Sequence, residues 1–259
     1  MVRVRKRHVQ QELFRHGGKR KGAGRKPKGS RAGAAHKRRP ELKPRFPAHV
    51  VLRVTPAVGS LRKRFMYQAL RAATIAVALR ELAYNDVKGA FRIVHISVQR
   101  THVHLLVEAD NKLALSRGMQ SFQISAAKHI NAAYSAKMRL TKRRRGSVFP
   151  DRFHQEIITT PRQARRALAY VLDNWRKHRE DRASHTKTWN VDPFSTGIQF
   201  DGWKERETAE TRWFGRDGYQ ALVVYLPHTW LLGEGWRKHG TISFYEVPST
   251  PPAPRRRAA

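Results

Sequence analysis

The sequence predicts an α+β fold in which an antiparallel sheet carries helices on one face. Three observations lead to this expectation. Short segments alternate apolar and polar residues, longer segments repeat apolar residues with helical spacing, and the two patterns follow one another as β-α-β-β-α-β with one further helix. That order is the ferredoxin-like unit. A chain of 259 residues has room for one such domain with extensions, or for two small domains.

The first strand and helix are expected at the start of this unit. Valine and leucine predominate over residues 48–54, which indicates a strand, and a break follows at Pro56 and Gly59. Residues 60–84 repeat apolar side chains among Arg, Lys and Ala at the spacing of an amphipathic helix.

A change of parity marks the central hairpin. Even positions are apolar in residues 93–98, whereas odd positions are apolar in residues 103–107. Because successive side chains of a strand point to opposite faces, the switch predicts a tight turn near residues 99–101 between two antiparallel strands.

The second half of the unit follows the same logic. A helix of about twenty residues is expected from Ser116, and a strand is expected over residues 148–158. A further helix begins with Thr160 as N-cap, Pro161 in the first turn and Gln163 three residues after the cap, which is a capping-box arrangement. This helix should run to about residue 177.

Composition divides the chain into three parts. Residues 1–45 mix Gly, Pro, Lys and Arg without apolar spacing, so we expect a disordered basic arm. Its core, Gly24-Arg25-Lys26-Pro27-Lys28, resembles an AT-hook for A·T-rich minor grooves, and a solvated arm that only raises affinity is the alternative. Residues 46–180 hold the folded domain. Residues 181–259 hold five of the six tryptophans, which indicates an irregular extension that packs aromatic rings onto the domain and ends in a disordered tail.

The charge of the chain points to a polyanion. Lys and Arg number 53 against 19 Asp and Glu, a formal net charge of +34. Residues 1–45 hold 17 basic and 2 acidic side chains, and residues 46–178 hold 24 and 7. Because each Lys or Arg that neutralises a phosphate releases counterions, nucleic acid is the first expectation for a partner. A membrane surface is disfavoured because the basic runs lack an apolar face.

Other classes of protein are excluded by what the sequence lacks. The chain has no cysteine, so disulfides, thiol nucleophiles and cysteine-rich zinc sites are ruled out. No stretch has the length and apolarity of a membrane span, and the basic N-terminus lacks the apolar core of a signal peptide. We therefore expect a soluble intracellular protein.

Two histidines are candidates for metal ligands. His102 and His104 are two residues apart on an expected strand, so both imidazoles project from one face while Val103 points to the core. Two imidazoles in this arrangement can share a divalent cation. Two polar residues on a solvated strand face would show the same spacing, so the pair needs a second, independent feature.

The last helix supplies that feature. At 100° per residue, Tyr170 lies about 130° from the centre of the apolar stripe, on a polar face with Gln163, Arg166, Asn174 and Lys177. Phosphoryl transfer to a protein nucleophile requires an attacking phenolate, a Lewis acid on the phosphate oxygens and nearby positive charge. This face could supply all three, and an ordinary surface tyrosine is the alternative.

Together these segments resemble a known family. They are His95-Ile96-Ser97-Val98, Thr101-His102-Val103-His104-Leu105-Leu106-Val107-Glu108, Asp151-Arg152-Phe153-His154 and Ala169-Tyr170-Val171-Leu172-Asp173-Asn174. Their order and spacing resemble the single-tyrosine HUH transposases, and most closely the REP-associated tyrosine transposases, over about residues 46–180.

The resemblance implies a ferredoxin-like HUH domain and a set of roles. It implies that His102, His104 and Asn174 bind Mg²⁺ or Mn²⁺ and that Tyr170 is the nucleophile. Asn174 is one methylene shorter than the Gln found in related enzymes. The implied reaction is cleavage of single-stranded DNA, expected as hairpins, with a 5′-phosphotyrosine and a free 3′-hydroxyl. The expected location is the cytoplasm, in association with the nucleoid.

Basic side chains are expected to contact the DNA backbone along the arm, the run after the second helix and the last helix. They are Arg25, Lys26, Lys28, Lys142, Arg143, Arg144, Arg145, Arg166 and Lys177. Three alternatives stay open: a nucleic-acid-binding protein that keeps the fold without cutting, a relaxase or rolling-circle initiator of the wider HUH class, and a homodimer in place of a monomer.

Overall fold

The computed structural model describes residues 39–84, 90–183, 186, 188–206 and 219–248. Contacts divide the chain into residues 1–36 and residues 37–259, and every described residue belongs to the second unit. The predicted AT-hook-like segment, with Arg25, Lys26 and Lys28, lies outside the described residues.

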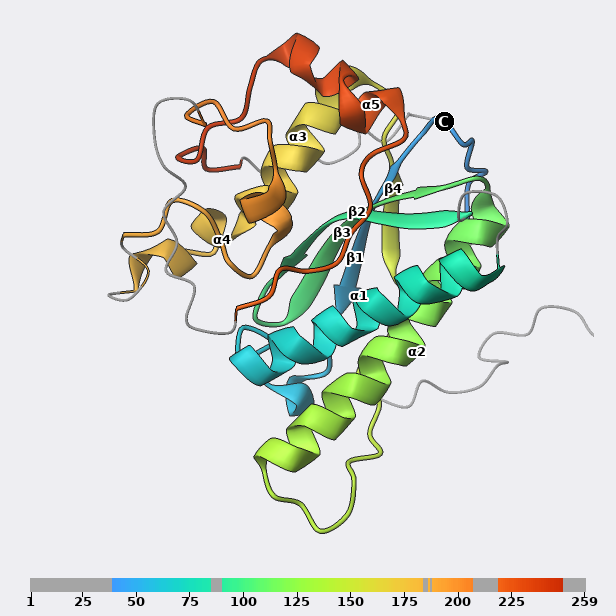
Figure 1. Cartoon of the computed structure of the whole chain (residues 1–259), viewed down its shortest axis with the longest axis vertical. Helices are drawn as coiled ribbons and strands as arrows, with labels where there is room; N and C mark the ends of the chain where they lie inside the picture. Colours follow the sequence, from blue (N-terminus) through green and yellow to red (C-terminus); the bar gives the residue numbers. More distant parts are fainter. Residues whose placement is uncertain (1–38, 85–89, 184–185, 187, 207–218, 249–259) are drawn as a thin grey trace, which may run out of the picture. The chain divides into compact units, whose positions relative to one another are not determined.

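The centre of the fold is one antiparallel sheet. Its strands are β1 (Ala48–Arg53), β2 (Phe91–Val98), β3 (His102–Ala109) and β4 (His154–Ile157), in the spatial order β2-β3-β1-β4 (Figure 1). The Gln99 N–H donates to the His102 carbonyl at 2.9 Å and closes the turn between β2 and β3. The predicted fold class and the parity-based hairpin are confirmed.

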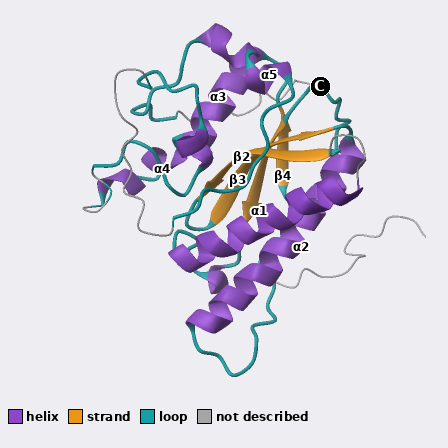
Figure 2. Ribbon diagram, in the orientation of Figure 1, coloured by secondary structure: helices purple, strands orange, loops and turns teal. Residues whose placement is uncertain are grey.

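Two long helices cover one face of the sheet. Helices α1 (Arg64–Tyr84) and α2 (Lys112–Lys137) lie side by side across it (Figure 2). They bury residues such as Leu70 and Phe122 in one cluster with Val50 and Leu105 of the sheet. Helix α2 starts earlier than its apolar spacing indicates, because the Asn111 side chain accepts hydrogen bonds from two backbone N–H groups of the first turn.

The further helix packs on the opposite face. Helix α3 (Pro161–Leu172) places Leu168 and Leu172 in a second cluster with Val94 and Leu106, which alternate with the residues of the first cluster. The capping box at Thr160 forms as predicted. Both faces of β2 and β3 are therefore covered, which explains why these strands are buried almost throughout.

Two predicted elements are shorter than expected. Helix α3 ends at Leu172, because Asp173 leaves helical geometry at φ −105° and ψ 13°, and the short helix α4 (Asn174–Lys177) follows. Of the strand predicted over 148–158, only β4 forms a ladder with β1; Pro150, ahead of it, has no N–H to donate.

The C-terminal segments are mostly irregular: those around the short helix α5 (Trp230–Gly233) lie against the second face, whereas residues 219–224 pack against the first cluster beside α1. Short 3₁₀ turns occur in the described chain at Pro56–Val58, Glu180–Arg182, Thr196–Gln199 and Gly235–His239. Trp203, Trp236 and Phe244 are buried in the α3 cluster. The buried carboxylate of Glu108 accepts from the backbone N–H groups of His228 and Thr229, so polar contacts join these segments to β3.

Within the described residues, no helix is both long enough and apolar enough to cross a lipid bilayer.

Candidate functional site

The two predicted histidines open the site at the start of β3. Their register against β1 is Arg53 opposite His102 and Val51 opposite His104, so all four side chains belong to the face that carries α3. The rings of His102 and His104 lie 4.7 Å apart between centroids and nearly perpendicular. The structure thus brings the two imidazoles together.

Tyr170 of α3 meets these histidines. Its ring centroid lies 5.2 Å from that of His104 and 5.7 Å from that of His49, both in edge-on geometry. His49 in turn hydrogen-bonds to His104, with 3.0 Å between Nε2 of His49 and Nδ1 of His104. Among the described residues, no hydrogen bond engages the Tyr170 hydroxyl. The Tyr170 phenol therefore lies beside the imidazole cluster, although Tyr170 follows His104 by 66 positions in the sequence.

Asn174 begins α4, one turn beyond Tyr170. It is 0% exposed, and neither its Oδ1 nor its Nδ2 has a hydrogen-bond partner among the described residues. One turn further, the ring of His178 lies 5.4 Å from that of His102. Asn174 therefore stands in the chain between two residues that contact the histidines, and its amide is buried without a partner.

Burial sets the charge state of the site. It lowers the pKa of His102 to about 4 and that of His104 to about 2, and the neighbouring imidazoles add to the effect. Both rings are consequently neutral at pH 7, which is the form that binds a metal ion. Burial raises the pKa of Tyr170, so its hydroxyl keeps its proton at rest. The ammonium of Lys177 lies 4.7 Å from the Tyr170 ring centroid, where positive charge would favour a phenolate.

Imidazole nitrogens and an amide oxygen are donor atoms of the kinds that divalent cations bind. Within the described part of the chain, Nε2 of His104 and the Asn174 amide are buried without a partner, and such orphaned polar groups are unusual in native proteins. Over the described ranges, no group of three or more His, Asp or Glu side chains forms a metal site. A cation here would depend on two imidazoles and one amide oxygen, with its remaining positions left to water or phosphate oxygens.

The predicted DNA-contacting residues differ in how they are held. Arg166 is exposed on α3, one turn before Tyr170. Arg143 donates to the Lys128 carbonyl, and Arg144 bonds to Asn131, so these two side chains are tied to α2. Lys142 and Arg145 are exposed and make no such contact with any described residue.

The chain that follows the basic run reaches the end of the sheet where the histidines lie. The Thr55 N–H donates to the Val148 carbonyl, and the Val54 N–H donates to the Thr101 carbonyl. The chain just after the run, the end of β1 and the residue before His102 are therefore neighbours.

The sequence did not single out His49 or His178. The signal for His49 was present, because it alternates with the buried Val50 on a strand that pairs with β3. It could be used only after the strand order was known. His178 follows a break in the last helix that the apolar spacing does not show.

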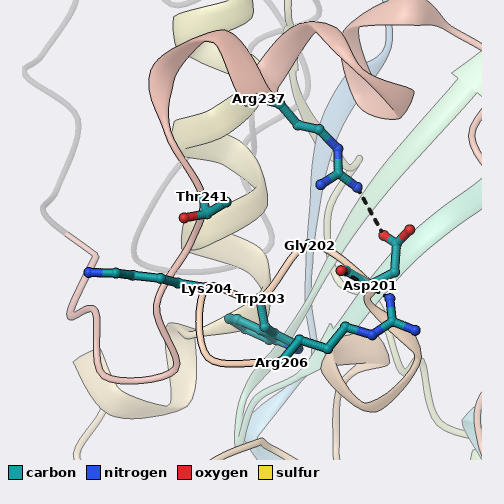
Figure 3. A pocket seen from close by; sticks show the side chains of 7 residues that line it. All are labelled: Asp201, Gly202, Trp203, Lys204, Arg206, Arg237 and Thr241. Atoms are coloured by element: carbon teal, nitrogen blue, oxygen red, sulfur yellow. Dashed lines mark hydrogen bonds and ion pairs between the residues drawn. The ribbon is translucent and has the colours of Figure 1, made fainter. Parts of the chain in front are cut away.

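A cavity of 560 Å³ lies apart from these residues, in the C-terminal segments. Figure 3 shows its lining, in which Arg237 points toward Asp201. None of the histidines, Tyr170 or Asn174 lines it. The cavity therefore gives no support to the predicted site, which rests on the contacts described above. Its lining residues are Asp201, Gly202, Trp203, Lys204, Arg206, Arg237 and Thr241.

Comparison with known proteins finds similarity to transposases. Residues 58–174 match the family model described as "Transposase IS200 like". Similar solved structures include a REP-associated tyrosine transposase bound to a REP hairpin, at 18% identity over 75% of this chain and 99% of that chain, with a TM-score of 0.43. A putative transposase from Deinococcus radiodurans R1 is 13% identical over 57% of this chain and 95% of that chain, with a TM-score of 0.33. No curated protein matches the chain.

Proposed function

Because residues 58–174 match the model of the IS200-like transposase family, we propose that the protein cuts and rejoins single-stranded DNA through Tyr170. One observation carries the proposal: the Tyr170 ring lies 5.2 Å from the ring of His104, at the cluster where two neutral imidazoles meet. A nucleophile and the candidate ligands of a Lewis acid are thus adjacent, as phosphoryl transfer to a protein side chain requires.

The covalent step conserves the phosphodiester. The Tyr170 oxygen attacks the phosphorus, the phenolic proton is lost, and the bond from phosphorus to the 3′ oxygen breaks. The products are a 5′-phosphotyrosine and a 3′-hydroxyl, which takes up one proton. Attack of that hydroxyl, or of another 3′-hydroxyl, on the phosphotyrosine reverses the step and joins DNA ends without a nucleotide cofactor.

The residues of the site have distinct tasks in this reaction. His102, His104 and Asn174 would hold Mg²⁺ or Mn²⁺, which supplies a Lewis acid for the phosphate oxygens. Lys177 stabilises negative charge on the phenol oxygen of Tyr170 through its position over the ring. Arg166 lies one turn before Tyr170 on the exposed side of α3, where it can contact the backbone of a bound strand.

The substrate we propose is a hairpin formed by a folded single strand. The supporting observation is charge: Lys142 and Arg145 are exposed on the segment that leads from α2 to the end of the sheet. Such side chains neutralise phosphates along a strand without reading its sequence.

A cleavage assay tests the proposal. The full-length protein is mixed with a labelled single-stranded hairpin in Mn²⁺, and in chelator as a control. We expect nicking that requires Mn²⁺ and a protein-linked 5′ end. Tyr170→Phe should abolish the adduct and leave hairpin binding close to wild type, because only the hydroxyl is removed. Metal-independent nicking, or an undiminished adduct in the Phe variant, would refute the assignment. Hairpin binding without any nicking would identify the non-catalytic alternative.

A further inference from the structure

His49 contacts both central groups of the site without being one of the expected ligands. Its Nε2 lies 3.0 Å from Nδ1 of His104, and its ring meets that of Tyr170 at 5.7 Å. It stands on β1, between Leu106 of β3 and Glu156 of β4 in the register of the sheet. A central strand flanked on both sides holds a side chain firmly, so the contact with His104 is part of the scaffold.

A hydrogen bond between two neutral imidazoles has one donor and one acceptor. Each neutral ring carries a single N–H, so either His104 donates from Nδ1 or His49 donates from Nε2. The two arrangements differ in the state of the remaining nitrogen of His104. In the first its Nε2 is a bare lone pair, and in the second it is an N–H group.

The surroundings of His104 and His49 favour the first arrangement, in which His104 donates from Nδ1. His104 is 3% exposed, and its Nε2 is buried without a hydrogen-bond partner in the described part of the chain. In the metal-free protein that nitrogen lacks a partner in either form, and an unpaired buried donor or acceptor is costly. A lone pair there is the atom that binds a cation. His49 is only partly buried, so a proton on its Nδ1 is less costly than one on Nε2 of His104.

We propose that His49 is a positioning residue that accepts the Nδ1–H of His104 and thereby fixes the tautomer whose Nε2 is free to bind the metal. A partner on the second nitrogen of a metal-binding histidine fixes both the tautomer and the orientation of the ring. Here an imidazole acceptor takes the place usually held by a carboxylate or a carbonyl. The metal-binding consequence rests on the function proposed above, whereas the tautomer is a property of the metal-free protein.

Three substitutions separate this role from a general structural one. His49→Leu removes the acceptor and retains an apolar side chain of moderate size. His49→Gln keeps an acceptor, since its terminal oxygen lies near the position of Nε2. His154→Leu is the matched control, because His154 lies opposite Val51 on β4 and on the same face, with no hydrogen bond to His104.

The tautomer is measured first, in the metal-free full-length protein. Long-range ¹H–¹⁵N correlation spectra distinguish Nδ1–H from Nε2–H, and the His104 signals are assigned by their loss in His104→Ala. We expect Nδ1–H in the wild type, in His49→Gln and in His154→Leu. His49→Leu should show a mixture or the Nε2–H form. An Nε2–H tautomer in the wild type, or no change in His49→Leu, would overturn the proposal.

Mn²⁺ affinity is measured next, by titration calorimetry in the absence of DNA. Loss of an orienting partner typically weakens metal binding about 10–100-fold. We expect that loss in His49→Leu, near-wild-type affinity in His49→Gln, and no change in His154→Leu. Equal losses in the Leu and Gln variants would overturn the proposal, because they would indicate packing rather than acceptance of a proton.

Failure of the proposed function has a different signature. If no DNA adduct forms at Tyr170, yet His104 keeps the Nδ1–H tautomer and Mn²⁺ affinity depends on His49, the function is refuted and the positioning role is supported. If the adduct forms and the tautomer does not depend on His49, the positioning role is refuted and the function stands.

Discussion

Breaking the ion pair between Arg62 and Asp192 should destabilise the fold strongly. Both side chains are shielded, at 7% and 0% exposure, and two N–H groups of Arg62 donate to the two carboxylate oxygens at 2.8 Å. The pair joins the residues just before α1 to the segment that follows α4 and lies against β2. Asp192→Asn keeps the shape and leaves the Arg62 charge without its main partner.

The size of the expected loss of stability follows from the burial of the pair. Removing one partner of a buried pair costs about 3–5 kcal/mol. We expect the low end of this range of free energies, since Glu180 lies 3.9 Å from Arg62 and compensates part of its charge. At 2–4 °C per kcal/mol for a domain of this size, we expect Tm to fall by roughly 6–12 °C. Thermal and urea unfolding followed by circular dichroism measure the change.

An exposed pair gives the matched control. Asp201 and Arg237 are 65% and 43% exposed and 3.5 Å apart, and such a pair contributes only about 0–1 kcal/mol. Asp201→Asn makes the same chemical change and should lower Tm by a few degrees at most. If Asp192→Asn costs no more than Asp201→Asn, the C-terminal segments do not contribute to the stability of the sheet in the way described.

Three further predictions concern packing, pH and DNA affinity. Gly118→Ala would place its Cβ 2.0 Å from the Phe91 ring, so we expect a loss of about 1–3 kcal/mol in urea unfolding, and an unchanged midpoint would show that α2 does not press on β2. Burial lowers the pKa of His95 to about 4, so the contribution of neutral His95 to the free energy of unfolding is complete above pH 6.5 and is lost as pH falls toward 4. The difference in free energy of unfolding between wild type and His95→Asn should therefore shrink by about 3 kcal/mol from pH 7 to pH 4. A difference that does not change with pH would contradict this. Lys142→Gln and Arg145→Gln should each weaken hairpin binding and reduce its salt dependence by about one phosphate contact, with Tm unchanged. Arg144→Gln should instead lower Tm, because the Arg144 side chain is bonded to Asn131. A lower Tm for Lys142→Gln or Arg145→Gln would show that these residues are structural.

Local patterns in the sequence were sufficient for most of the sheet and helices. The parity switch between residues 93–98 and 103–107 located the hairpin, and the capping box at Thr160 located the start of α3. Both signals depend only on neighbours in the chain. The end of α3 at Leu172 escaped prediction, because the break at Asp173 has no Gly or Pro to mark it.

The sequence motifs predicted the central residues of the site, but not the neighbouring residues that hold them in place. His102, His104 and Tyr170 lie on faces that the periodicity of strand and helix defines. The pairing of β1 with β3 brings His49 to His104, and no local sequence pattern predicts such a long-range contact. The placement of α3 on the second face depended in the same way on tertiary packing.

The covalent link to DNA is the central claim, and mass spectrometry of the trapped adduct tests it most directly. Trypsin cuts after Arg166 and Arg176, and the peptide between these cuts has Tyr170 as its only hydroxyl-bearing side chain. After reaction with a hairpin in Mn²⁺, we predict that this peptide carries a 5′-phosphate-linked nucleotide. An adduct found on any other peptide, or this peptide left unmodified while the DNA is nicked, would contradict the account.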